Sequence, residues 1–434
     1  MSGATEQPDV RPSRLSRDEI EANFADLHPP LSRSEALIES DRCYFCFDAP
    51  CTTACPTGID IPVFIQKIRS DNIRGSAHTI LSENIMGGMC ARVCPTEVLC
   101  EEACVRNTHE EKPVEIGLLQ RYATDPVIAA DDHLFVRSPA SGKRVAVVGG
   151  GPAGLSCAHR LSMLGHDVVV FNRDDKLGGL NEYGIAAYKT VNDFAQTEVD
   201  YILSIGGIEI RNNVSLGEDV QLAELSNDYD AVFLGIGLAG SNDLGIDGED
   251  KEGVINAIDY IAELRQADDK SALPIGKTVI VIGGGMTAID IAVQSRHLGA
   301  EHVHMVYRRG PEKMSASVFE QALAQTSGVT IHHRAPPKRI LGDDHVTGVE
   351  FETDSGKIVL YADMVFKAIG QQIQGFSEFD MDHGRIVVDA GYKTSIDKVW
   401  AGGDCVVGGN DLTVSAVQHG KLAAIDIDRA LREG

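Results

Sequence analysis

The sequence contains one unit twice: a short run of β-branched residues, a turn of consecutive glycines, and a helical pattern. The first strand is expected at 144–148 and the second at 278–282. The turns that follow read Gly149-Gly150-Gly151-Pro152-Ala153-Gly154 and Gly283-Gly284-Gly285-Met286-Thr287-Ala288. A strand that runs through such a turn into a helix begins a parallel α/β unit, whose helix N-terminus binds a pyrophosphate. The repeat therefore predicts two Rossmann-like domains that bind dinucleotides.

The first unit has additional features of an FAD site. A second strand is expected at 167–171, followed by a second glycine turn at Gly178-Gly179. Such a strand usually ends in Asp or Glu, which binds the ribose hydroxyls, whereas this one ends in Asn172. Asn accepts a hydrogen bond but carries no charge, so we expect FAD with weaker binding of its adenosine ribose, or with help from Asp174. A glycine turn that serves only close packing is the alternative.

The second unit predicts a nicotinamide cofactor. Ala288 replaces the last glycine of the turn, which affects only the distance between helix and strand. The strand expected at 303–307 ends in Arg308 and Arg309, with no acidic residue. A guanidinium pairs with a 2′-phosphate that a carboxylate would repel, so NADPH is favoured and NADH remains possible. The alternative is two exposed surface arginines without a ligand.

A third motif completes the expected flavin site. Residues 399–404 read as a strand and a turn that ends in Gly403-Asp404, and a helical pattern follows over 413–424. In flavoproteins with two dinucleotide domains such an Asp holds the ribityl chain. The positive end of the following helix stabilises the anionic reduced flavin.

Eight of the ten cysteines are clustered near the N-terminus. They form the groups Cys43-x2-Cys46-x4-Cys51-x3-Cys55-Pro56 and Cys90-x3-Cys94-Pro95-x4-Cys100-x3-Cys104. Short spacings with Cys-Pro steps are typical of ferredoxin-type clusters, and eight cysteines supply two four-ligand clusters with none left over. Zinc sites are a less favoured alternative, because only Cys43 and Cys46 have the knuckle spacing. Disulfides are disfavoured because no secretion signal is seen.

The region around these cysteines reads as helical. Short helices are expected at 61–69, 74–84 and 116–122, with few strands between 34 and 124. Residues 1–30 are polar and contain a short helical pattern at 16–27, so we interpret them as a docking arm or a disordered lead-in.

Size and charge limit the remaining classes of protein. A length of 434 residues suggests about three domains. The formal net charge of -25 disfavours nucleic acid and anionic membranes as partners. Residues 1–17 lack an apolar signal core, and no apolar run reaches the roughly 20 residues that span a bilayer. We therefore expect a cytoplasmic protein.

With these motifs in this order, the chain resembles a known family: the electron-input half of dihydropyrimidine dehydrogenase and the small subunit of glutamate synthase. The first is the closer match and looks like the flavin subunit of the split bacterial enzyme. The resemblance is carried by three segments: Cys43-Tyr-Phe-Cys46-Phe-Asp-Ala-Pro-Cys51, Cys90-Ala-Arg-Val-Cys94-Pro95-Thr96, and Val114-Glu-Ile-Gly-Leu-Leu-Gln120.

The resemblance implies a different set of iron ligands from the simple allocation of eight cysteines. One [4Fe-4S] cluster would take Cys43, Cys46, Cys51 and Cys104. The other would take Cys55, Cys94, Cys100 and Gln120. Cys90 would then not bind iron, although a glutamine ligand is unusual. The eighth ligand is thus either Gln120 or Cys90, with Gln120 favoured.

The resemblance also implies the domain arrangement. A helical domain with two [4Fe-4S] clusters would be followed by two Rossmann-like α/β domains, the second inserted in the first. The expected boundaries are 1–137 for the iron-sulfur domain, 138–245 and 368–434 for the FAD domain, and 246–367 for the NAD(P)H domain. The chain would cross between the last two near 237–247 and near Ala368-Ile369-Gly370.

The family's cofactor contacts can be placed on this sequence. Lys189 stands where the family tends to place an Arg near the flavin phosphates. Because hydride transfer depends on stacking and distance, we assign no catalytic acid or base. The candidate cofactor-binding residues are Gly149, Gly151, Pro152, Ala153, Gly154, Asn172, Gly178, Gly179, Leu180, Lys189, Val214, Gly283, Gly285, Met286, Thr287, Ala288, Arg308, Arg309, Ala368, Ile369, Gly370, Gly403, Asp404, Thr413 and Val414.

The resemblance implies an enzyme subunit that passes electrons from NAD(P)H through FAD and two [4Fe-4S] clusters to a partner. The partner would carry FMN and iron-sulfur clusters and would reduce uracil or thymine to the dihydropyrimidine. The alternatives are a glutamate synthase small subunit, a general NAD(P)H:ferredoxin-type oxidoreductase, and a redox sensor or scaffold with vestigial sites.

Overall fold

The computed structural model describes residues 15–130, 133–238, 240–373 and 378–433. The chain folds into two compact units. One contains the chain up to Leu27, Tyr183–Val191 and Ser241–Gly370, and the other contains His28–Glu182, Asn192–Gly240 and Gln371–Gly434. None of the helices in the described residues combines the length and apolar character needed to cross a bilayer.

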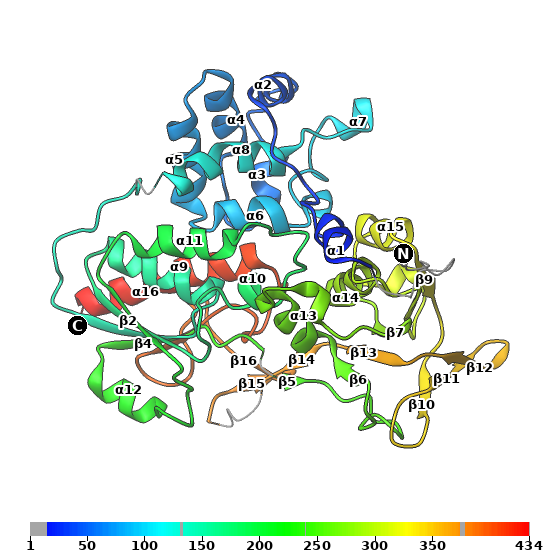
Figure 1. The fold of residues 1–434 in the computed structure, drawn as a ribbon. Helices are drawn as coiled ribbons and strands as arrows, with labels where there is room; N and C mark the ends of the chain where they lie inside the picture. Colours follow the sequence, from blue (N-terminus) through cyan, green and yellow to red (C-terminus); the bar gives the residue numbers. More distant parts are fainter. Residues whose placement is uncertain (1–14, 131–132, 239, 374–377, 434) are drawn as a thin grey trace, which may run out of the picture. The chain divides into compact units, whose positions relative to one another are not determined.

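The larger unit opens with a helical region, blue to cyan in Figure 1, that has no strand among the described residues 28–130. The helices are α2 (Arg33–Asp41), α3 (Pro50–Ala54), α4 (Ile61–Arg69), α5 (Ile73–Glu83), α6 (Gly87–Val93), α7 (Asn107–Glu110) and α8 (Ile116–Ala129), with a 3-10 turn η1 (Thr96–Val98). The side chains of Asp60 and Asn72 cap α4 and α5. The predicted helix at 61–69 is confirmed, and that at 74–84 is shifted by one residue.

The core of this region contains the cysteines. Apolar faces of α4 and α8 pack together, and partly buried Cys43, Cys51, Cys55, Cys100 and Cys104 pack against them. Helix α8 continues to Ala129 although Pro126 lies inside it. The predicted end at 122 was therefore too early, since burial of the second half of the helix outweighs the local cost of the proline.

The same unit contains a parallel sheet with the strand order β17-β4-β1-β2-β3. Its strands are β1 (Arg144–Val148), β2 (Asp167–Asn172), β3 (Ile208–Asn212), β4 (Ala231–Leu234) and β17 (Val399–Ala401). Helices α9 (Pro152–Met163), α11 (Phe194–Leu203), α12 (Leu222–Asp228) and α16 (Thr413–Glu433) belong to it. The predicted strand at 144–148 is confirmed, and β1, the centre of the sheet, is buried over Val145–Val148 as a two-sided strand must be.

Helix α16, red in Figure 1, lies directly against α9. The hydroxyl of Ser156 donates to the carbonyl of Val417 at 2.8 Å. A Cβ at Gly420 would lie 2.1 Å from the carbonyl oxygen of Ala153, so only glycine allows this approach. Helix α16 is thus packed tightly against α9, the first helix of the sheet.

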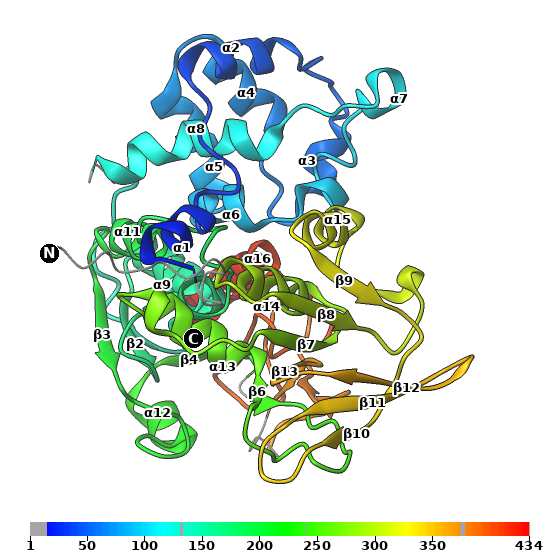
Figure 2. The ribbon, with the colours of Figure 1, turned by 45° about the vertical axis from the view of Figure 1, so that its right-hand side comes forward.

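The other unit contains the second predicted parallel sheet, with the order β6-β13-β7-β8-β9 (Figure 2). Its strands are β6 (Val254–Asn256), β7 (Thr278–Gly283), β8 (His302–Val306), β9 (Val329–His332) and β13 (Met364–Ala368), and its helices are α13 (Ala257–Gln266), α14 (Met286–His297) and α15 (Val318–Thr326). An antiparallel sheet of β10 (Pro337–Leu341), β11 (Gly348–Thr353) and β12 (Gly356–Tyr361) adjoins it in sequence.

The remaining short elements of the described chain are divided between the two units. They are α10 (Leu180–Tyr183), β5 (Gly240–Ser241), η2 (Lys270–Ala272), η3 (Pro311–Lys313), β14 (Gln371–Gln372), β15 (Met381–Asp382) and β16 (Arg385–Ile386).

Helix α1 (Arg17–Asn23) belongs to this second unit. Ser16 and Glu19 form a capping box at its start, and Ile20 and Phe24 are buried in the same apolar cluster as the strands β7 and β8. Of the two interpretations of the N-terminal segment, docking therefore holds for residues 15–27, and a disordered lead-in is wrong for them. Residues 1–14 lie outside the described residues.

Candidate cofactor-binding sites

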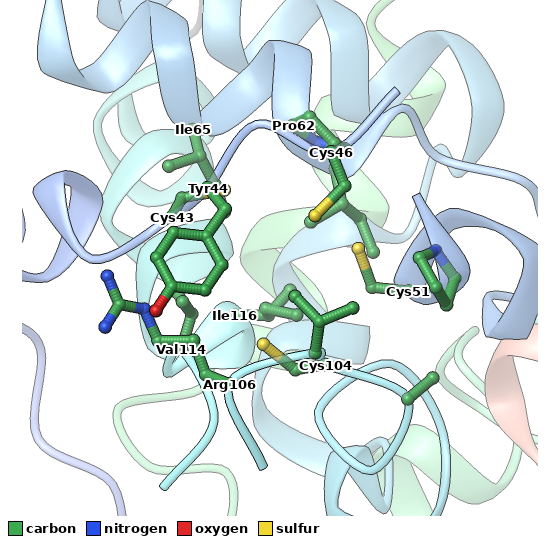
Figure 3. Close-up of a pocket in the computed structure, with 14 residues that line it drawn as sticks. Cys43, Tyr44, Cys46, Cys51, Pro62, Ile65, Cys104, Arg106, Val114 and Ile116 are labelled. Carbon is green, nitrogen blue, oxygen red and sulfur yellow. The ribbon is translucent and has the colours of Figure 1, made fainter. Parts of the chain in front are cut away.

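Three cysteines that are close in sequence and one from a later part of the helical region line one pocket (Figure 3). They are Cys43, Cys46, Cys51 and Cys104, the first of the two predicted ligand sets. The other lining residues include the apolar side chains of Ile61, Pro62 and Ile65 from α4, and Val114 and Ile116 near the start of α8. Soft sulfur ligands in an apolar shell suit an iron-sulfur cluster, so the residues present fit the predicted group.

The backbone conformation of this segment explains how cysteines that are close in sequence line the same pocket. Phe45 and Ala49 adopt positive φ angles of 53° and 27°, which non-glycine residues rarely do. The amide of Phe45 donates to Cys43 Sγ at 3.4 Å. Pro50 then starts α3, which carries Cys51. Strained backbone of this kind is common where a loop must surround a bound group.

The three cysteines of the second predicted set also come together, with one addition. The thiols of Cys94 and Cys90 are hydrogen-bonded, and Cys55 and Cys100 lie close enough for their charges to act on Cys94. The Sγ of Cys55 is also 3.3 Å from Oγ1 of Thr57. The structure thus brings Cys90, which the family resemblance excludes, to the predicted ligands.

Burial controls the ionisation of these thiols. It raises the pKa of Cys51 to about 12 and raises that of Cys100 well above its usual value. The pKa of Cys94 is raised by its bond to Cys90 and by burial. Iron binds thiolates, so loading of either set must release protons.

Within the described residues, no group of three or more His, Cys, Asp or Glu could hold a single metal ion.

Gln120 is buried on α8, and its Nε2 donates to the carbonyl of Gly87 at 2.7 Å. Gly87 begins α6, the helix of Cys90. Both candidates for the eighth ligand therefore belong to the neighbouring helices α6 and α8, and the choice of Gln120 over Cys90 stays a prediction.

The first glycine turn has the close contacts that the sequence predicts. A Cβ at Gly149 would lie 2.3 Å from the carbonyl oxygen of Gly235, and one at Gly154 would lie 1.9 Å from that of Gly149. At Gly151, the N-cap of α9, the nearest atom is 3.7 Å away, on Gly179. The turn is therefore packed tightly inward and is open at the helix N-terminus, which is the cradle that a pyrophosphate requires.

The turn Gly178-Gly179 lies directly beside the first turn. The amide of Gly178 donates to the carbonyl of Gly150 at 2.7 Å, and both glycines have positive φ. Asn172 joins the two turns: its Oδ1 accepts from the amide of Gly150 at 3.2 Å, and its Nδ2 donates to the carbonyl of Lys176 at 3.0 Å. This bridging role was missed at the sequence level, where only a ribose contact was expected.

Other predicted flavin residues occupy the same part of this unit. Val214 donates its amide to the carbonyl of Asn172 at 3.0 Å, and Thr413 donates its hydroxyl to Asn181 at 2.7 Å. Leu180 begins α10 and is partly exposed, whereas Val414 on α16 is buried. A Cβ at Gly403 would lie 3.0 Å from Cβ of Ala153, which places the end of β17 beside the first turn.

Two titratable groups flank Gly403. Burial, with the charge of Asp411, raises the pKa of Asp404 to about 6. The amide of Gly403 donates to Nδ1 of His419 at 3.2 Å, and burial lowers the pKa of this imidazole. Because Nδ1 accepts this hydrogen bond, it carries no proton in this arrangement. No sequence pattern marked this residue beyond its place on the predicted helix.

The second glycine turn repeats these close contacts in the other unit. A Cβ at Gly283 would lie 2.2 Å from the carbonyl oxygen of Ala368, which precedes the predicted Ile369 and Gly370. Gly285 is the N-cap of α14, whose first residues are Met286, Thr287 and Ala288. The ring of Tyr307 packs on Gly284, a contact that the sequence did not reveal. This turn also fits a dinucleotide.

The two predicted arginines are exposed after the end of β8. The amide of Arg334, which follows β9, donates to the carbonyl of Arg309 at 2.9 Å. Arg334 is exposed and has a φ of 55°. Three arginines thus gather at the carboxyl ends of neighbouring parallel strands, although the sequence pattern predicted only Arg308 and Arg309.

Lys189 is buried in an ion cluster. Its Nζ lies 2.8 Å from Asp290 and 2.7 Å from Glu320. Burial opposes the charge, but the two carboxylates outweigh it and raise the pKa of Lys189. These bonds tie the segment Tyr183–Val191 to α14 and α15 within one unit. The predicted contact of Lys189 with flavin phosphates stays a prediction.

Comparisons with known proteins identify two matching family models. Residues 143–420 match the model described as pyridine nucleotide-disulphide oxidoreductase. Residues 20–131 match the model described as dihydropyrimidine dehydrogenase domain II, 4Fe-4S cluster.

Three curated relatives are similar along almost their whole length. The NAD-dependent dihydropyrimidine dehydrogenase subunit PreT homolog of Salmonella typhi is 34% identical over 416 residues, covering 95% of this chain and 98% of that protein. PreT of Salmonella typhimurium is 33% identical, with the same coverage. The glutamate synthase [NADPH] small chain of Escherichia coli is 33% identical over 457 residues, covering 96% of this chain and 95% of that one.

Two solved structures share the fold of the two-sheet region. Thioredoxin reductase from T. acidophilum has a TM-score of 0.55 and 21% identity, covering 67% of this chain and 99% of that chain. FprA of Mycobacterium tuberculosis, in complex with NADPH, has a TM-score of 0.56 and 18% identity, covering 68% and 85%.

Proposed function

This chain belongs to the family of the dihydropyrimidine dehydrogenase subunit PreT and the glutamate synthase small chain, and we propose that it carries electrons from NAD(P)H to a partner subunit. It is a pyridine nucleotide-dependent oxidoreductase with a 4Fe-4S domain. The proposal rests on one observation: the chain that forms a pocket of four cysteines also has two glycine turns, each at the start of a helix.

The second glycine turn would hold NAD(P)H. The amides at the start of α14, which follows the N-cap Gly285, bind the pyrophosphate. Arg308 and Arg309 attract the 2′-phosphate of NADPH, which makes NADPH the favoured donor. The relatives differ on this point, because PreT is named NAD-dependent and the glutamate synthase small chain is named for NADPH.

The first glycine turn would hold FAD. Gly151 at the start of α9 binds the pyrophosphate, Asn172 orients both glycine turns, and Asp404 binds the ribityl chain. Strands β1 to β4 and β17 lie on either side of 241–370 in sequence yet form one sheet, which supports insertion of the NAD(P)H domain into the FAD domain. The domain boundaries expected from the sequence stay a proposal, and they differ from the compact units, in which α1 and Tyr183–Val191 belong with the second sheet.

Two [4Fe-4S] clusters would be held by the two cysteine sets. Cys43, Cys46, Cys51 and Cys104 hold the first, which we name the pocket cluster. Cys55, Cys94 and Cys100, with Gln120 as favoured fourth ligand, hold the second, which we name the inner cluster. When bound, FAD would supply the conversion between hydride and single-electron transfer, and the iron-sulfur clusters would supply single-electron transfer. The protein contributes thiolates, an apolar shell and fixed positions.

The electrons would then pass to a partner subunit. This partner would carry FMN and iron-sulfur clusters and would reduce uracil or thymine. The similarity to PreT supports this partner, and the near-equal similarity to the glutamate synthase small chain supports a glutamate synthase small subunit as the second candidate. A general NAD(P)H:ferredoxin-type oxidoreductase is the third.

Composition of the purified protein tests the proposal first. Anaerobic purification should give about eight irons, eight sulfides and one FAD per chain, since each cubane holds four irons. NADPH should bleach both chromophores. Stoichiometric zinc, or a colourless protein that does not respond to NADPH, would rule the proposal out.

Substrate dependence then separates the candidates. Co-purification with an FMN protein and uracil-dependent NADPH oxidation would support pyrimidine reduction. Turnover that requires glutamine and 2-oxoglutarate would identify a glutamate synthase instead.

A further inference from the structure

A buried lysine lies beside the chain segment that carries Cys55. Lys421 is on α16, and only 9% of its side chain is exposed. Its Nζ donates to the carbonyl oxygens of Thr57 at 3.1 Å and Glu83 at 3.0 Å, and to the Glu83 carboxylate at 2.9 Å. All three ammonium hydrogens thus have acceptors, which fixes the charge in place.

Thr57 connects this ammonium to the cysteine. It is buried, and its Oγ1 lies 3.3 Å from Cys55 Sγ. The amide of Gly58 donates to the carbonyl of Cys55 at 2.9 Å, which closes the turn between them. One residue therefore bonds both the ammonium and a predicted ligand sulfur of the inner cluster.

The positive charge is incompletely neutralised inside the protein. The side chain of Glu83 is 46% exposed, so water screens its carboxylate more than it screens the Lys421 ammonium. Arg160 is a second cation nearby, since the charge of Glu83 acts on it and it donates to the carbonyl of Ser82 at 2.7 Å. Two cations therefore face one partly solvated carboxylate.

Each electron that enters an iron-sulfur cluster adds one negative charge to it. Fixed positive charge and hydrogen bonds to the sulfurs favour the reduced form, so they raise the reduction potential. We propose that Lys421 raises the potential of the inner cluster and thereby favours electron flow into it. The inference rests on the proposed function, because it requires that cluster to be bound.

A redox titration of the anaerobically purified protein, followed by electron paramagnetic resonance, tests this role. Lys421→Met should shift the inner cluster to a lower potential, while Lys421→Arg, which keeps the charge, should shift it much less. Glu83→Gln removes the counter-charge and should shift the same cluster upward. A residue needed only for packing would not give shifts of opposite sign from the two partners.

Arg429→Met is the matched control, because Arg429 is on the same helix with 68% of its side chain exposed. It should leave both potentials near those of the wild type, and Lys421→Met should shift the pocket cluster less than the inner one. If clusters are present and neither Lys421→Met nor Glu83→Gln exceeds the control, the inference is wrong. If Lys421→Met does not fold, Glu83→Gln decides the question: an upward shift of the inner cluster supports the inference, and no shift contradicts it. If the wild type contains no clusters, the proposed function itself fails.

Discussion

At the scale of single residues, the eighth iron ligand depends on two side chains on neighbouring helices. We expect Cys90→Ala to keep about eight irons per chain and Gln120→Ala to lose or alter the inner cluster. The reason is the resemblance, which selects Gln120, and the buried position of its amide beside α6. Iron and sulfide analysis with electron paramagnetic resonance measures this. Loss of about four irons in Cys90→Ala alone would favour the eight-cysteine allocation instead.

Glu198 gives a prediction about pH. Its Oε1 accepts from the amides of Gly88 at 2.7 Å and Met89 at 3.0 Å, while Oε2 has no hydrogen-bond partner in the described part of the chain. Burial raises its pKa from 4.5 to about 8. The folded state then binds this proton more tightly than the unfolded state, so its contribution to stability falls as pH rises from about 4.5 to 8.

Glu198→Gln cannot titrate and should therefore gain stability relative to the wild type between pH 5 and 8. The expected gain is on the order of 1 kcal/mol per pH unit across this window. Denaturant unfolding of both proteins at several pH values measures it. Glu218→Gln, at an exposed position, is the control and should show no trend. A constant difference between Glu198→Gln and wild type would contradict the assigned protonation.

The residue types at the sites could be predicted, but several of their contacts could not. The cysteine spacings and glycine turns are local patterns, and the structure brings their members together. Asn172 joins two turns, and Lys189 pairs with Asp290 and Glu320, which follow it by about a hundred residues or more. Such partners depend on tertiary packing, which spacing along the chain does not encode.

At the scale of elements, Lys189 holds the segment Tyr183–Val191 against α14 and α15. Lys189→Met would leave Asp290 and Glu320 buried without this cation, which typically costs about 3–5 kcal/mol of unfolding free energy. Thermal and denaturant unfolding measure the loss. Lys338→Met removes an exposed ion pair with Glu352 and should cost less than about 1 kcal/mol. Equal effects of the two substitutions would contradict the importance of the buried cluster.

The end of β8 should determine the choice of nicotinamide cofactor. Replacing Arg308 and Arg309 together by Ala should raise the KM for NADPH roughly tenfold or more, since charged hydrogen bonds contribute about 1.5–3 kcal/mol each. The KM for NADH should change little. Steady-state assays with both cofactors test this, with exposed Arg339→Ala on β10 as control. An equal increase for both cofactors would remove the preference for NADPH.

Strands and helices were predicted best where local pattern and burial agree. Strand β1 and helix α4 begin and end as expected, because β-branched runs and capping residues mark them. Helix α8 runs past its expected end, and the pattern at 16–27 could not decide between docking and disorder. The end of α8 and the position of α1 depend on apolar contacts made elsewhere in the fold.

At the scale of the whole molecule, the iron-sulfur clusters should hold the helical region together. The cysteines are part of its apolar core, and removal of a structural metal group destabilises the fold around it. Anaerobic removal of iron should increase hydrogen exchange in residues 28–130 much more than in the two parallel sheets. Mass spectrometry of the exchanged peptides measures this. An even increase along the chain would mean that the clusters support the whole fold instead.

The contact between α9 and α16 has a consequence for biosynthesis. The ribosome makes β4 and α9 long before β17 and α16, because residues 241–370 emerge in between. Until then the nascent chain has an unpaired edge on β4 and an uncovered face on α9, both of which invite aggregation. The rate of translation and the supply of chaperones should therefore affect the yield of folded protein more strongly here than in a protein whose first sheet is completed early in synthesis.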